Sequence, residues 1–164
     1  MIIVFCFNSI WKMMMDYTLL MKGKTMIELR ENSLSLKEYL MLRASVNWKV
    51  LNESQAKKAL ENSLLTVAAY EDNKLIGMGR IVGDGAVICY IQDLIVRPEC
   101  QKMGVGKLII NRLIEYVDSI TEEDNEMMLC LMCAKGREEY YKRFGFVARP
   151  TDNLGPGMIQ YRHK

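Results

Sequence analysis

The chain has 164 residues, half of them apolar and 26% charged, which is the composition of a globular protein with one hydrophobic core. Its 22 basic and 20 acidic side chains leave a net charge of +2, so no clustered basic surface for nucleic acid is expected. Five cysteines without an export signal favour free thiols in a reducing, cytoplasmic location over a disulfide framework.

Residues 1–25 are predicted to be an extension, flexible or loosely docked, in front of one domain over 26–164. The apolar run at the start ends at Lys12 and is shorter than the ~20 residues of a membrane-spanning helix. It also lacks the basic leading region and small-residue cleavage site of a secretory signal. No membrane partner is therefore expected, and a natural start at Met26 is the alternative to an extension.

Strand-like and helix-like patterns alternate from Met26 onward. Alternation of apolar and polar residues predicts a strand over 26–31. Helical spacing predicts helices over 35–46, with Ser35 as the N-cap, and over 52–63, capped at Asn52 or Ser54. Three strands are predicted within 64–98, joined by turns at 71–74 and 83–86.

The second half of the chain begins with an amphipathic helix. Its apolar stripe recurs every three or four residues: Val105, Leu108, Ile109, Leu113, Ile114, Val117 and Ile120. A buried strand is then predicted over 126–133, a short helix over 137–144, and the last strands at 146–150 and 157–162. The prediction is a single α/β domain of the α+β type, with a mixed, mostly antiparallel sheet of about six to seven strands flanked by about four helices.

Cys130 and Cys133 form a C-x-x-C pair, but no metal site is predicted there. Such sites need a second pair of ligands, and the chain contains one histidine, His163. In a strand, positions 130 and 133 point to opposite faces, so two small buried thiols are the preferred interpretation.

Two glycines stand in the stretch "RPECQKMGVGKLI", residues 97–109, where an apolar helix begins. Converging backbone amides at a helix start can bind an anion, and the helix dipole adds partial positive charge. Ile109 occupies the position of the third glycine in a dinucleotide-binding loop, and Gln101 occupies the position of the first glycine in a Walker loop. Both of those phosphate loops are therefore excluded.

The surroundings of this loop resemble the central motif of the GNAT superfamily of N-acetyltransferases. A strand ends in Val-x-Pro and leads to Gln101-Lys102-Met103-Gly104-Val105-Gly106 at the head of a helix. Downstream, "EYYKRFGF" is similar to the family's Tyr-x-x-x-Gly-Phe ending, filled by Tyr141, Gly145 and Phe146. The resemblance covers roughly 26–162, and Ala134 stands where many members have an asparagine.

The resemblance implies acetyl-CoA as co-substrate, with no metal. The pyrophosphate is expected on the amides of the loop, and the pantetheine arm is expected to pair with a bulged strand like an added strand. The expected cofactor-binding residues are Leu94, Ile95, Val96, Gln101, Lys102, Met103, Gly104, Val105 and Gly106.

The resemblance also implies Tyr141 as the general acid that protonates the departing thiolate. Asp93 is the candidate base, because a carboxylate within an apolar strand is unfavourable unless it is paired with another group or takes part in the reaction. A structural partner for a backbone amide or an arginine is the alternative role for Asp93, and a chain of waters is the alternative base. A backbone N–H near Leu94 or Ile95 is expected to stabilise the oxyanion.

The acceptor is expected to be a primary amine of a small molecule or a peptide. Trp48, in the connection between the first two helices, is a candidate wall of the acceptor site, with packing on the core as the alternative. Asp152 is a candidate contact for a cationic amine, with a solvated or turn-forming role as the alternative. Homodimers are common in such folds. A noncatalytic acyl-CoA-binding sensor or regulatory module is the alternative function.

Overall fold

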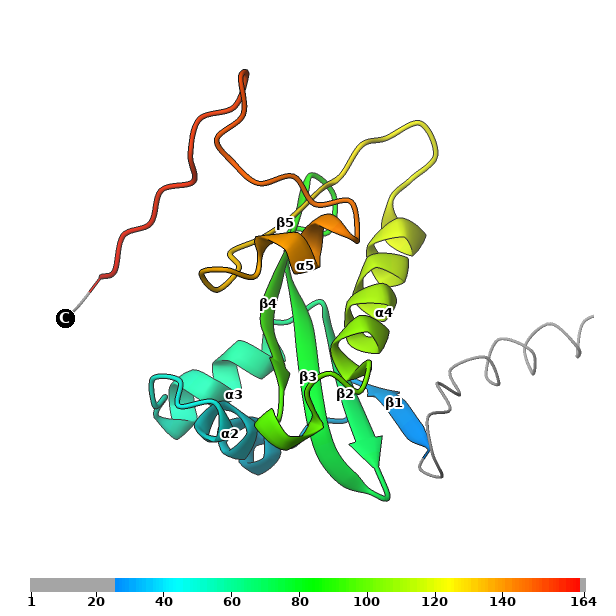
Figure 1. Ribbon diagram of the computed structural model, residues 1–164, viewed down its shortest axis with the longest axis vertical. Helices are drawn as coiled ribbons and strands as arrows, with labels where there is room; N and C mark the ends of the chain where they lie inside the picture. The colour runs from blue at the N-terminus through cyan, green and yellow to red at the C-terminus, as the bar shows by residue number, and fades with distance from the viewer. Residues whose placement is uncertain (1–25, 163–164) are drawn as a thin grey trace, which may run out of the picture. The chain divides into compact units, whose positions relative to one another are not determined.

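A computed structural model describes residues 26–162, so the predicted extension over 1–25 lies outside the described residues (Figure 1). The described chain divides into two compact units within its last strand, one ending at Leu129 and the other starting at Cys130. The sheet has five strands in the order β1-β2-β3-β4-β5, and the pairs from β1 to β4 are antiparallel. The strands are β1 (Ile27–Glu31), β2 (Leu65–Glu71), β3 (Lys74–Gly83), β4 (Ile88–Val96) and β5 (Met128–Leu131).

The helices begin where the capping residues predict. Ser35 accepts a hydrogen bond from the N–H of Glu38, whose carboxylate accepts from the N–H of Ser35, so a full capping box starts the first helix. Asn52, not Ser54, caps the second helix through a 2.7 Å bond from Gln55 N–H. The helices are α2 (Leu36–Ser45), α3 (Glu53–Glu61), α4 (Val105–Ile120) and α5 (Glu138–Lys142).

The predicted hairpin between β2 and β3 is confirmed. Asp72 and Asn73 are the two residues between the strands, and both have positive φ, 48° and 60°. Two left-handed central residues match the right-handed twist of the flanking strands. The next connection is longer, and the carboxylate of Asp84 holds it by accepting three backbone N–H groups from residues 86–88.

Helices cover both faces of the sheet in the first unit (Figure 1). On one face, Tyr39 and Leu42 of α2 pack in a core with Met78 of β3 and Ile95 of β4. On the other face, α4 packs over β2, β3 and β4. Since Gly77 and Gly79 alternate with Met78, these two glycines face α4, and their missing side chains allow the helix to approach β3 closely.

The sheet has fewer strands than the six to seven predicted, because the segments 146–150 and 157–162 do not form strands. Pro150, Pro156 and the two glycines at 155 and 157 interrupt this segment, and both residue types disfavour strands. The strand predicted over 126–133 shortens to Met128–Leu131. Within residues 26–162, no helix combines the length and apolarity needed to span a membrane.

The close contact between α4 and β3 leads to a stability prediction. A Cβ atom on Gly77 would lie 2.9 Å from the carbonyl oxygen of Ile95 and 3.1 Å from Cδ1 of Ile109. A backbone oxygen cannot turn aside, so we expect Gly77→Ala to lower the free energy of unfolding by about 1–3 kcal/mol in urea titrations. Gly155→Ala is the control, because a Cβ there meets nothing within 4 Å. Equal stability of the two variants would contradict the prediction.

Candidate active site

A β-bulge interrupts β4 in the middle of the strand. Met78 pairs with Ile95 and Arg80 pairs with Gln92, so Asp93 and Leu94 of β4 stand opposite the single residue Gly79 of β3. Asp93 takes a left-handed conformation with φ 56°. The bulge predicted for this strand is therefore present, and it removes two residues from the regular ladder.

The register after the bulge decides which backbone groups stay available. Arg97 N–H donates to Ile76 O at 2.9 Å, and alternate residues of an antiparallel strand direct their polar groups to the same edge. The N–H and C=O of Ile95 therefore point toward β3, whereas those of Val96 point to the opposite edge. Gln101 Nε2 donates to Val96 O at 3.2 Å, which agrees with that direction. Among the predicted strand residues, Leu94 and Val96 thus present the backbone groups best suited to an added strand.

The loop after β4 leads to the start of α4. A short 3-10 turn, Pro98–Cys100, is followed by Lys102 with φ 65° and Gly104 with φ 89°. Gly104 is the N-cap residue and provides no side-chain hydrogen bond, and the first turn of α4 contains no acidic residue. The first amides of this 16-residue helix are left without a capping side chain, which is the arrangement that binds an anion.

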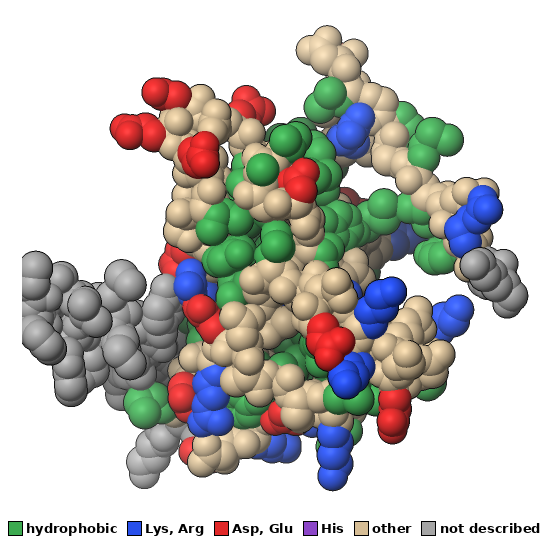
Figure 2. Space-filling model, turned by 180° about the vertical axis from the view of Figure 1, so that it is seen from behind, with side chains coloured by type: hydrophobic (Ala, Val, Ile, Leu, Met, Phe, Trp, Pro, Cys, Tyr) green, Lys and Arg blue, Asp and Glu red, His purple; other side chains and the backbone are tan. Residues whose placement is uncertain are grey.

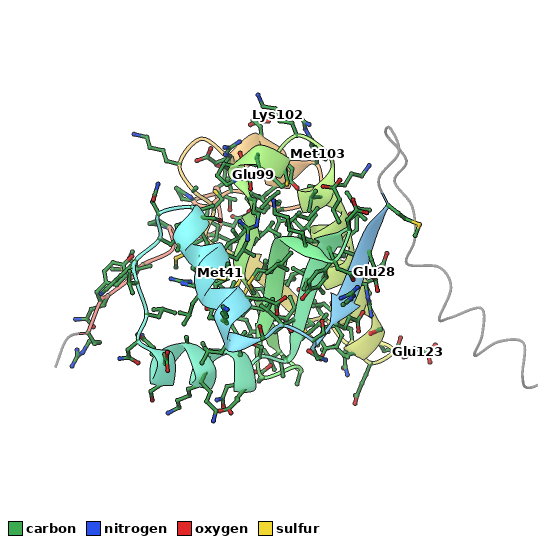
Figure 3. All side chains as sticks on the ribbon, turned by 90° about the horizontal axis from the view of Figure 1, so that it is seen from below. Glu28, Met41, Glu99, Lys102, Met103 and Glu123 are labelled. Atoms are coloured by element: carbon green, nitrogen blue, oxygen red, sulfur yellow. The ribbon has the colours of Figure 1, made fainter. Side chains whose placement is uncertain are left out.

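The side chains of the loop are directed outward. Figure 3 shows Lys102 and Met103 pointing away from the sheet, and Met103 is 41% exposed. Anion binding here therefore depends on backbone amides, with Lys102 and Lys107 adding positive charge at the same end of α4.

On the face seen in Figure 2, basic side chains are interspersed with acidic ones instead of forming one continuous patch.

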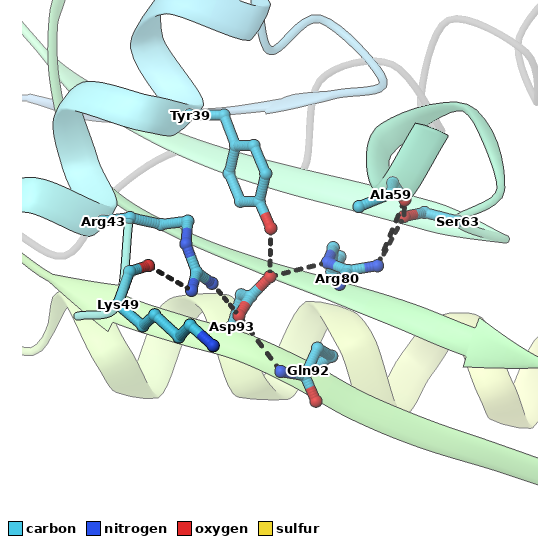
Figure 4. A network of polar contacts seen from close by, with 8 residues as sticks. All are labelled: Tyr39, Arg43, Lys49, Ala59, Ser63, Arg80, Gln92 and Asp93. Carbon is cyan, nitrogen blue, oxygen red and sulfur yellow. Dashed lines mark hydrogen bonds and ion pairs between the residues drawn. The ribbon is translucent and has the colours of Figure 1, made fainter. Parts of the chain in front are cut away.

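Asp93 is the centre of a buried polar network (Figure 4). The residue is 3% exposed, and both carboxylate oxygens are bonded twice. One oxygen, Oδ2, accepts from Tyr39 Oη at 2.6 Å and from Arg80 Nε at 2.8 Å. The other, Oδ1, accepts from Arg43 Nη1 at 2.8 Å and from Gln92 Nε2 at 3.1 Å.

The network lowers the pKa of the Asp93 carboxyl below its ordinary value. Burial by itself raises this pKa, but the hydrogen bonds from Tyr39 and Arg80 and the charges of two arginines together outweigh burial. Burial and the bond to Asp93 raise the pKa of the Tyr39 hydroxyl. At neutral pH, Asp93 is thus a carboxylate and Tyr39 a neutral donor.

Trp48 lies beside this network on the connection between α2 and α3. The guanidinium carbon of Arg43 is 5.2 Å from the centre of the Trp48 ring, and Arg43 Nη2 donates to Lys49 O at 3.2 Å. Trp48 is 39% exposed. One face of its ring therefore contacts a cation, while part of the ring is available to solvent.

Tyr141 belongs to the second unit, in α5. The helix ends in a Schellman motif, in which left-handed Gly145 (φ 85°) donates to Lys142 O and the N–H of Phe146 donates to Tyr141 O. The rings of Tyr141 and Phe146 meet edge to face, 6.1 Å apart. The Tyr-x-x-x-Gly-Phe pattern therefore has a physical function, because it ends the helix and packs Phe146 against the half-buried tyrosine.

The other candidates of the second unit make fewer described interactions. Asp152 is exposed in a turn that a bond from Thr151 N–H to Leu154 O closes. Cys130 and Cys133 are partly exposed free thiols, and burial raises the pKa of Cys130. No cluster of metal-ligating side chains occurs among residues 26–162.

Three members of the Asp93 network were not predicted from the sequence: Tyr39, Arg43 and Arg80. The sequence contained one indication of Arg80, which is the charged residue in the middle of a strand whose other residues after Lys74 are apolar or glycine. Tyr39 and Arg43 are four residues apart, so they lie on the same side of α2. Nothing in the sequence indicated that both side chains meet Asp93, which lies 54 and 50 residues further along the chain.

This arrangement, a bulged strand that leads into the uncapped start of a helix, is the one expected for an acyl-CoA-dependent transferase. The chain belongs to the acetyltransferase (GNAT) family, whose model matches residues 32–146. It is an N-acetyltransferase, and the family transfers acetyl groups from acetyl-CoA. The resemblance found in the two motifs is thereby confirmed.

Known relatives agree with this assignment. An uncharacterized N-acetyltransferase ycf52-like protein of Prochlorococcus marinus is 30% identical over 125 residues, 74% of this chain and 67% of the relative. A Staphylococcus aureus crystal structure named "Probable Acetyltransferase" is 29% identical, with a TM-score of 0.72 over 82% of this chain and 99% of its own. An aminoglycoside N-acetyltransferase in complex with CoA shares the fold at 16% identity, with a TM-score of 0.62 over 89% and 99% of the two chains.

The lowered pKa of Asp93 predicts how stability depends on pH. A group with a lower pKa in the folded state contributes stability above its unfolded pKa, about 4, and loses that contribution as the pH falls through the folded value. We expect Asp93→Asn to lower the free energy of unfolding at neutral pH by about 3 kcal/mol, since buried Arg80 and partly buried Arg43 lose their counter-charge. We also expect the melting temperature of this variant to fall less between about pH 5 and 3 than that of the wild type.

Thermal unfolding followed by circular dichroism tests this expectation. Asp72→Asn is the control, because Asp72 has a similar φ of 48° but lies exposed in the β2–β3 turn. Parallel pH curves for the wild type and Asp93→Asn would show that the carboxylate does not stabilise the fold.

Proposed function

We propose that this protein transfers an acetyl group directly from acetyl-CoA to a primary amine of a small molecule or a peptide. One observation carries the proposal: the chain leads from Leu94 and Val96, whose backbone groups point away from β3, directly to the uncapped amides at the start of α4. The strand edge suits the two amides of a pantetheine arm, and the helix start suits a pyrophosphate.

The residues of the loop fit this co-substrate chemically. Gly104 brings the backbone close to an anion without a Cβ, and the absence of acidic residues from the first turn of α4 avoids repulsion. Gln101 holds the carbonyl of Val96 and so secures the junction between strand and loop. Acetyl-CoA supplies the thioester carbonyl and a thiolate leaving group, and the protein supplies the groups that hold and polarise them.

Tyr141 is the proposed general acid. An unperturbed tyrosine has a pKa of about 10, so it can donate its proton to a thiolate whose conjugate acid has a pKa near ~8.5. The N–H of Leu94 is the preferred oxyanion donor, because the register directs the N–H of Ile95 toward β3. Trp48 and Asp152 stay proposed contacts of the acceptor amine.

Binding and turnover of acetyl-CoA test the proposal together. We expect calorimetric titration to give a Kd in the micromolar range for the wild type and a Kd at least about 100-fold higher for Gly104→Glu, which places a side chain and a negative charge at a residue with φ 89°. Gly155→Glu, in open space on the second unit, is the control. A screen of primary amines for thiol release then identifies the acceptor class. Binding without release for any amine would favour the noncatalytic sensor.

The role of Tyr141 is tested with its neighbour as the matched control. We expect Tyr141→Phe to lower kcat by about 10²-fold or more and to leave the Kd of acetyl-CoA unchanged, because only the transferable proton is lost. Tyr140→Phe removes the corresponding hydroxyl from the residue next to it on α5, and we expect near wild-type kcat. Similar kcat values for the two variants would exclude Tyr141 as the acid.

A further inference from the structure

Asp93 occupies a backbone conformation that few residues other than glycine adopt. Its φ of 56° lies inside a strand, at the residue where the β3–β4 register shifts. A left-handed conformation costs a non-glycine residue up to about 1–2 kcal/mol, less for Asp and Asn, and surrounding contacts must offset this cost. The contacts that hold Asp93 are therefore also the contacts that hold the bulge.

Those contacts come from three different elements. Tyr39 and Arg43 reach the carboxylate from α2, Arg80 reaches it from β3, and Gln92 reaches it from β4 itself. Each carboxylate oxygen has two acceptor positions in its plane, and the four donors occupy all of them. No position is left on this carboxylate for a proton from an incoming amine unless one of these bonds breaks.

The network extends beyond the carboxylate in two directions. Arg80 Nη1 donates to Ala59 O and to Ser63 Oγ at the end of α3, both at 3.2 Å. Arg43 continues to Lys49 O and to the ring of Trp48. One buried anion thus connects the bulge of β4 to α3 and to the connection that carries the candidate acceptor wall, as Figure 4 shows.

We propose that Asp93 is a positioning residue: its carboxylate holds the bulge in the form that exposes the edge of Leu94 and Val96 to acetyl-CoA, and it also orients the connection that carries Trp48. The neutral acceptor amine attacks the thioester carbonyl, and its nitrogen releases a proton to water as the N–C bond forms. The C–S bond then breaks as Tyr141 gives its proton to the departing sulfur, and Tyr141 regains a proton from solvent. This inference rests on the proposed acetyl transfer. Arg43, Arg80 and Tyr39 are positioning residues of the same network.

Two substitutions separate the position of the carboxylate from its basicity. Asp93→Asn keeps the size of the side chain and the tolerance for positive φ but removes the base. Asp93→Glu keeps a carboxylate but adds a methylene and disfavours the left-handed conformation. If Asp93 is a positioning residue, we expect Asp93→Glu to bind acetyl-CoA more weakly than Asp93→Asn does, with a Kd about 10-fold or more higher. With Asp93 as the base, Asp93→Asn would bind acetyl-CoA like the wild type and lose about 10²–10⁴-fold in kcat, and this result would overturn the inference.

The wild-type enzyme provides a second test that does not depend on either variant folding. The acid limb of kcat/KM is measured with two acceptor amines that differ in their own pKa. If water accepts the proton, we expect the pH at which kcat/KM falls on the acid side to follow the pKa of the amine, because the neutral amine is the reacting form. A limb at the same pH for both amines would show that a group of the enzyme, and not the amine, titrates there, and this result would overturn proton release to water.

Arg43→Lys tests the connection to the acceptor side. A lysine can pair with Asp93, but it cannot at the same time reproduce the planar fork that reaches Lys49 O. We expect the KM of the amine to rise several-fold while the Kd of acetyl-CoA stays within about twofold of the wild type. Asp72→Asn should change neither constant. An unchanged amine KM in Arg43→Lys would overturn the proposed link from Asp93 to the acceptor side.

The two proposals fail in different ways. If no amine is acetylated although acetyl-CoA binds, the proposed function fails, while the Kd values of the Asp93 variants still test the positioning role. If amines are acetylated and Asp93→Asn binds acetyl-CoA normally but does not turn over, only the positioning role fails.

Discussion

The carboxylate of Asp93 is the constraint on which the first unit of this protein depends. A buried anion is tolerated only where donors surround it, and four donors from α2, β3 and β4 do so here. Because these donors lie on different elements, the carboxylate brings one helix and two strands to a common point. That point is also where the ladder between β3 and β4 is interrupted. The packing of α2 on these strands and the shape of the β4 edge therefore both depend on Asp93.

The opposite face of the sheet has a complementary constraint. Gly77 and Gly79 have no side chains, and α4 lies against β3 where those side chains would be. The helix is the one whose first amides have no capping side chain. Close packing on this face and the bulge on β4 together determine how the strand edge leads into the helix start. A strand edge and a helix start joined in this way are what an acyl-CoA co-substrate requires, with its pantetheine amides and its pyrophosphate.

Local signals in the sequence predicted most elements correctly. Ser35 and Asn52 mark helix starts because their side chains accept the free N–H groups of the first turn, and Asp72-Asn73 forms the predicted two-residue turn. The last two predicted strands were wrong because proline and glycine outweigh the apolar pattern in 146–162. The Tyr141–Phe146 pattern was found through a resemblance, and the Schellman motif explains it as local backbone geometry.

The sequence by itself determined the family, the glycine loop and the order of the elements, because each depends on residues close together in the chain. The surroundings of Asp93 were decided only by tertiary structure. Its partners Tyr39, Arg43 and Arg80 come from distant positions, and hydrogen bonds between side chains on different elements leave no periodic trace in a sequence. The direction of the β4 backbone groups was likewise decided by the bulge, because one extra residue in a strand changes which edge every following amide faces.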